Sequence, residues 1–116
     1  MMQTAITIDP DYLVTRLKAL LAIPSPTGFT DEAVRYVARE LEHLGLEVML
    51  TRRGAIRARR AGLTERPARG IVSHVDTLGA QVKYLKENGR LELVSIGNWS
   101  ARFAEGARVS IFSSKG

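Results

Sequence analysis

Two residues of this sequence, His74 and Asp76, combine side chains and a spacing that suit a metal ion. They lie two positions apart in the run 71–76, whose β-branched apolar residues predict a short buried strand. Side chains alternate across a strand, so positions two apart project to the same face. His74 could therefore give one ring nitrogen to a zinc-like ion while Asp76 accepts the N–H of the other nitrogen, which fixes the tautomer and the ring orientation.

The pair alone does not establish a metal site. A histidine and an aspartate at this spacing are also compatible with a core histidine that is merely hydrogen-bonded. The predicted strand is followed by a tight turn at Gly79, so the pair lies near the carboxyl end of the strand. In open α/β sheets, ligands bind at the carboxyl ends of strands. The choice between a metal ligand and a hydrogen-bonded core histidine therefore depends on the elements that surround the pair.

Length and composition indicate a globular protein that uses no cysteine. The chain has 116 residues, of which 45% are hydrophobic and 25% charged, the balance of one ordinary domain. Without cysteine there are no disulfides and no thiolate ligands, so any metal must use nitrogen and oxygen. No apolar run reaches membrane-spanning length and no signal-peptide core is present, so we expect a cytoplasmic protein without a membrane partner.

The net charge of +5 is concentrated in the segment 52–69, called the arginine segment below. It holds seven arginines and one acid, Glu65, whereas the rest of the chain is close to neutral. One interpretation is a solvated or subunit-contacting face, and the other is a patch for an anion or nucleic acid. Nucleic acid is disfavoured because interleaved aromatic residues and a recognition-helix pattern are both missing.

Two helices are predicted before the strand. Asp9 and Pro10 are typical of a helix start, and leucines at helical spacing up to Leu21 form a stripe that predicts a core-facing surface. Two prolines in the segment 23–28 end this helix. A second helix is predicted from Thr30, its cap, to the glycine at position 45.

Short strands are predicted around and after the His74 strand. Strands at 46–50 and 55–59 joined by a glycine turn, together with the helices, indicate one edge of an α/β sandwich. Strands at 81–85 and 90–96 flank an Asn-Gly pair, a strong hairpin signal, and a further strand is expected at 109–112. Short strands without a helical period predict a small antiparallel β-barrel. Trp99 is interpreted as a packing residue of this barrel, with a substrate platform as the alternative.

These elements, in this order, resemble the metallopeptidase family of glutamyl and tetrahedral aminopeptidases, peptidase family M42. The resemblance is carried by the segment 23–28 before a helix, by Ser-His-Val-Asp-Thr-Leu-Gly at 73–79, and by Glu-Gly-Ala-Arg-Val at 105–109. The motifs at 52–54 and 99–106 look most similar to the branch associated with osmoprotectant gene systems.

The resemblance implies a fold and a domain organisation. Residues 1–78 would form the N-terminal part of an α/β/α aminopeptidase sandwich, and residues 79–116 would begin an inserted β-barrel domain that is incomplete here. Both halves lack strands that such folds need, so we expect the chain to be the N-terminal portion of a longer protein.

The resemblance also implies a reaction, the hydrolysis of N-terminal residues from peptides by a homo-oligomeric enzyme. His74 would bind one of two divalent metal ions, zinc or cobalt, and Asp76 would orient it. The remaining ligands would come from later parts of the fold. The alternative is a non-catalytic short domain that binds an anionic partner or another subunit through the arginine segment.

Overall fold

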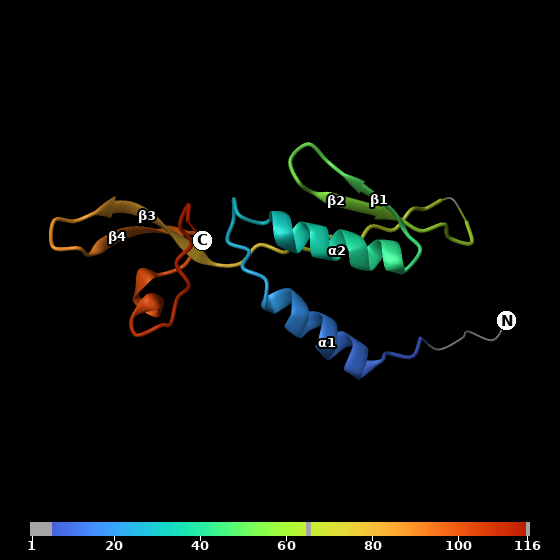
Figure 1. Cartoon of the computed structure of the whole chain (residues 1–116). Coiled ribbons are helices and arrows are strands. Elements are labelled where there is room, and N and C mark those ends of the chain that lie inside the picture. Colours follow the sequence, from blue (N-terminus) through green and yellow to red (C-terminus); the bar gives the residue numbers. More distant parts are fainter. Residues whose placement is uncertain (1–5, 65, 116) are drawn as a thin grey trace. The chain divides into compact units, whose positions relative to one another are not determined.

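The computed structural model describes residues 6–64 and 66–115, which fall into two units (Figure 1). The first unit spans residues 1–77 and contains two helices and one β-hairpin. The second spans residues 78–116 and contains a second hairpin and one short 3₁₀-helix. This mixture of helices and strands agrees with the predicted α/β class. No helix among the described residues is both long and apolar enough to cross a membrane.

Helix α1 (Pro10–Leu21) begins where the sequence predicts. Asp9 is its N-cap and accepts the backbone N–H of Tyr12 on Oδ1 at 3.0 Å, which satisfies one of the free donors of the first turn. The predicted burial of the leucine stripe was wrong, because no residue of α1 is buried in the described structure. The helix contacts α2, and most of its apolar stripe has no covering segment among the described residues.

Helix α2 (Asp31–His43) carries the small core of the first unit. Ala33, Val34 and Ala38 are its buried residues. Thr30 is the N-cap as predicted, but its side chain makes no capping hydrogen bond. An ion pair of 3.0 Å between Arg16 of α1 and Glu40 of α2 adds a polar contact between the two helices.

The predicted hairpin follows α2. Strands β1 (Glu47–Leu50) and β2 (Ile56–Arg59) pair antiparallel and both contact α2. Gly54 has φ +80 in the connecting turn, a conformation that favours glycine. Along β2, Ile56 is half-buried, while Arg57, Ala58 and Arg59 are all exposed. The arginine segment therefore contributes exposed cations to the surface of this hairpin.

The predicted buried strand around His74 was wrong. Residues 71–75 form no strand, and Ile71 and Val72 are 100% and 96% exposed. A strand exists only when a second strand satisfies its backbone groups, and the described residues supply none at this position. The segment is instead fixed at its end, where Thr77 forms an isolated parallel bridge with Pro26.

The second unit is built on the predicted Asn-Gly hairpin. Strands β3 (Gly79–Leu85) and β4 (Leu91–Ile96) pair antiparallel, and Gly89 adopts φ +79 in the turn between them. The indole N–H of Trp99 donates to the carbonyl oxygens of Ile96 at 2.9 Å and Gly79 at 3.2 Å. Trp99 thus packs at the open end of this hairpin.

The β-barrel expected in this unit is not formed by the described residues, whose only sheet here is the two-stranded β3–β4 hairpin. The strand predicted at 109–112 was wrong, since these residues form no strand. Val109 and Ile111 are largely exposed, because no neighbouring strand covers them in the described part of the chain. A short 3₁₀-helix, η1 (Ala101–Ala104), precedes this segment.

Candidate functional site

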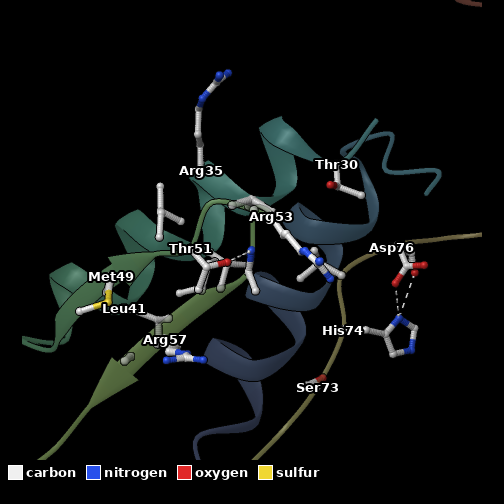
Figure 2. A pocket seen from close by; sticks show the side chains of 18 of the residues that line it. Thr30, Arg35, Leu41, Met49, Thr51, Arg53, Arg57, Ser73, His74 and Asp76 are labelled. Atoms are coloured by element: carbon white, nitrogen blue, oxygen red, sulfur yellow. Dashed lines mark hydrogen bonds and ion pairs between the residues drawn. The ribbon is translucent and has the colours of Figure 1, made fainter. Parts of the chain in front are cut away.

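His74 and Asp76 lie together, as their spacing predicts (Figure 2). Nδ1 of His74 lies 3.0 Å from Oδ1 of Asp76 and 3.1 Å from the backbone oxygen of the same residue. An ionised carboxylate and a carbonyl oxygen can only accept, so in the neutral imidazole Nδ1 carries the proton. Nε2 then holds the free lone pair, on a side chain that is 81% exposed. This arrangement presents one nitrogen ligand to a metal ion.

The second oxygen of Asp76 has its own partner. The hydroxyl of Thr27 donates to Oδ2 of Asp76 at 2.7 Å. This hydrogen bond, followed by the one from His74, holds the pKa of the Asp76 carboxyl below its ordinary value, because both stabilise the charged form. Both oxygens of the carboxylate are therefore engaged, each by a different residue.

The loop before α2 positions Thr27. Pro24 and Pro26 restrict the backbone of this loop, and Gly28 adopts φ +90, which allows the chain to reverse. The N–H of Phe29 donates to the carbonyl oxygen of Pro26 at 2.8 Å and closes a tight turn. Ser25 is only 1% exposed. The two prolines of this loop predicted the end of a helix, and no pattern in the sequence assigned Thr27 to the site.

His74 and Asp76 line a wide, open hollow of the first unit (Figure 2). The hairpin turn and β2 line the same hollow and bring four members of the arginine segment to it: Arg52, Arg53, Arg57 and Arg59. None of these four forms an ion pair with another described residue. Apolar residues such as Val37, Ile71 and Val72 also line the hollow.

The described residues fit one metal ligand but not a complete metal site. No group of three or more His, Asp or Glu side chains within this part of the chain has the arrangement of a metal centre. A catalytic zinc ion ordinarily takes three protein ligands and one exchangeable position. His74 could supply one of these ligands, with Asp76 as its hydrogen-bonded support.

Comparisons with known proteins point to one family. Residues 54–116 match the family described as M42 glutamyl aminopeptidase. The chain is 36% identical over 100 residues to the putative aminopeptidase YhfE of Bacillus subtilis strain 168. The matched residues cover 86% of this chain and 29% of that protein. It is 28% identical over 105 residues to the glutamyl aminopeptidase of Lactococcus lactis subsp. cremoris strain MG1363, covering 90% of this chain and 30% of that protein. The chain thus spans about three tenths of the length of these curated relatives. By this match of sequence, the chain belongs to the M42 glutamyl aminopeptidase family.

Proposed function

We propose that this chain belongs to an enzyme that removes N-terminal residues from peptides with the help of two divalent metal ions, zinc or cobalt. The observation that carries the proposal is the contact of His74 Nδ1 with Asp76 Oδ1, which leaves Nε2 free, in a member of the M42 family. Both curated relatives are named aminopeptidases. The non-catalytic alternative gains no support from these relatives.

In this proposal His74 and Asp76 have different roles. His74 binds one ion through Nε2. Asp76 holds the proton on Nδ1, fixes the ring orientation and raises the basicity of the ligating nitrogen. When bound, the metal ions supply Lewis acidity toward the scissile peptide carbonyl. A single histidine cannot hold two ions, so the proposal requires further ligands from outside the described residues.

The fold is part of the same proposal. Residues 1–78 would form the N-terminal part of a catalytic α/β/α sandwich, and residues 79–116 would begin an inserted β-barrel. The exposed apolar side chains of Ile71, Val72 and Ile111 support this proposal, because additional strands would bury them. A homo-oligomeric state and a cytoplasmic location are also proposed, and they rest on family membership and composition.

The test uses the protein that carries this chain, expressed at its natural length. After metal removal by a chelator, hydrolysis of leucine and glutamate p-nitroanilides should be absent, and added zinc or cobalt should restore it. An N-acetylated substrate should not be cleaved, because an aminopeptidase needs a free amino group.

The His74→Ala variant should lose bound metal and hydrolysis together. His43→Ala is the matched control, because His43 lies at the exposed end of α2 and contacts Glu40 at 3.9 Å. It should retain both properties. Wild-type hydrolysis in His74→Ala, or no hydrolysis by the metal-loaded wild-type protein, would overturn the proposal.

A further inference from the structure

Thr27 makes a long-range side-chain contact with the proposed site. Its hydroxyl donates to Oδ2 of Asp76 at 2.7 Å, across 49 positions of sequence. An ionised carboxylate cannot donate, so the hydroxyl must be the donor. The threonine is itself exposed, so this contact belongs to the surface of the site and not to the core.

The loop that carries Thr27 is fixed to the segment that carries Asp76. The backbone N–H of Thr77 donates to the carbonyl oxygen of Ser25 at 2.7 Å, and Pro26 and Thr77 form a parallel bridge. These contacts adjoin the Thr27–Asp76 hydrogen bond, since Ser25 and Pro26 directly precede Thr27 and Thr77 directly follows Asp76. The hydroxyl is therefore presented to the carboxylate by a backbone that is already held in register.

The orientation of His74 depends on Asp76. Residues 71–75 have no strand pairing that would hold the backbone, and the hydrogen bonds of the His74 ring in the described structure all go to Asp76. The carboxylate of Asp76 can rotate about its terminal torsion, which has broad minima. With Oδ2 bound by Thr27, rotation is restricted and Oδ1 stays directed toward His74 Nδ1.

We propose that Thr27 is a positioning residue for His74 and acts through Asp76. The hydroxyl fixes the carboxylate, the carboxylate fixes the Nδ1–H tautomer and the ring orientation, and Nε2 is thereby preorganised for the metal ion. This inference rests on the proposed function, since it assigns a metal-binding purpose to the ring. It extends that proposal to a residue of the loop before α2.

The first experiment compares Thr27→Val, Thr27→Ser and Thr30→Val. Valine keeps the branched shape and removes the hydroxyl, whereas serine keeps the hydroxyl. Thr30→Val is the matched control, because it makes the same chemical change at a hydroxyl that forms no capping bond. Long-range ¹H–¹⁵N spectra of the imidazole should show the Nδ1–H tautomer of His74 in wild type, Thr27→Ser and Thr30→Val, and a mixture of tautomers in Thr27→Val.

The second experiment measures zinc affinity by competition with a chromophoric chelator, using the protein at its natural length. Removal of a residue that supports a ligand typically weakens metal binding by about 10–100-fold, and we expect a loss in this range for Thr27→Val. Thr27→Ser should restore most of it. A wild-type tautomer and wild-type zinc affinity in Thr27→Val would overturn the inference.

A double-mutant cycle separates this route from a general structural effect. In an Asp76→Asn background, Thr27→Val should change zinc affinity little, because the carboxylate through which Thr27 acts is gone. The same loss in both backgrounds would overturn the inference. Absence of hydrolysis by a wild-type protein that binds zinc would contradict the peptidase proposal alone, while the tautomer and affinity comparisons would still decide the role of Thr27.

Discussion

The backbone N–H of Thr77 donates to the carbonyl oxygen of Ser25 at 2.7 Å, and this hydrogen bond joins the segment after His74 to the loop before α2. The adjoining Pro26 forms a parallel bridge with Thr77. In the described structure, His74 and Asp76 are therefore placed by a short backbone contact with a loop and not by a sheet. The stability of that loop controls the geometry of the candidate site.

Ser25 offers a test of how this loop is packed. It is 1% exposed, and its Oγ has no hydrogen-bond partner among the described residues. A buried polar group without a partner destabilises by about 1–3 kcal/mol, so Ser25→Ala should leave the free energy of unfolding unchanged or raise it by about 1 kcal/mol. Ser25→Leu should lower it by about 1–3 kcal/mol, because a larger side chain overpacks the position. Urea denaturation followed by circular dichroism measures both, and a marked loss in Ser25→Ala would contradict the prediction.

Gly97 tests the packing of Trp99 in the second unit. Its φ is +90, and an added Cβ would lie 3.2 Å from Cδ2 of Leu78 and 3.7 Å from Cδ1 of Trp99. Gly97→Ala should therefore lower the free energy of unfolding by about 1–2 kcal/mol from backbone strain, with a further loss from displacing Leu78. Gly106→Ala is the control, because Gly106 has φ +72 with nothing within 4 Å of the added atom.

Trp99 fluorescence during urea denaturation reports these two variants. The emission of Gly97→Ala should shift to longer wavelength, as the indole loosens from the carbonyl oxygens that it contacts. The emission of Gly106→Ala should remain at the wild-type position. Equal destabilisation by the two substitutions would show that the contact at Gly97 contributes nothing.

The N-cap of α1 gives a third prediction. Asp9→Ala removes the acceptor for the Tyr12 N–H and should destabilise the first unit by about 1 kcal/mol. Asp11→Ala is a suitable comparison, since Asp11 lies in the same first turn but is not the cap. It should have the smaller effect, seen as a smaller loss of helical signal at 222 nm on heating. A larger loss for Asp11→Ala would contradict the assigned cap.

Elements with local signals could be predicted from the sequence. The cap and proline at the start of α1, the glycine after α2 and the Asn-Gly turn between β3 and β4 each act within a few residues, and the structure forms all of these elements. The juxtaposition of His74 and Asp76 was equally accessible, because their spacing is only two residues. Local chemistry determines these features, so one sequence suffices.

Features that depend on distant partners could not be predicted. The strand expected at 71–76 needs a neighbour to satisfy its backbone, and the leucine stripe of α1 needs a covering segment, yet the described residues provide neither. The role inferred for Thr27 was also inaccessible. Its only signal is a hydroxyl in a proline-restricted loop, and no pattern in the sequence indicates that the loop meets Asp76.

The acidity of Asp76 provides a fourth prediction, for the metal-free chain. The hydrogen bonds from Thr27 and then His74 lower the pKa of its carboxyl in the folded state. The unfolded-state pKa of aspartate is about 3.9. A group whose pKa is lower in the folded state stabilises the fold at pH values above its unfolded-state pKa. This contribution is lost as the pH falls through the folded-state pKa. The side chain is 43% exposed, so solvent limits the size of the effect.

Thr27→Val should move the pKa of Asp76 upward, because it removes the largest cause of the lowering. The stabilising contribution would then be lost at a higher pH than in the wild type. The ¹³C shift of the Asp76 carboxyl, followed from neutral pH to pH 2, measures the midpoint directly. Thr30→Val should leave this midpoint where it is in the wild type. The same midpoint in the wild type and Thr27→Val would show that the hydroxyl does not stabilise the carboxylate in solution, and it would also remove the physical basis for the inferred role of Thr27.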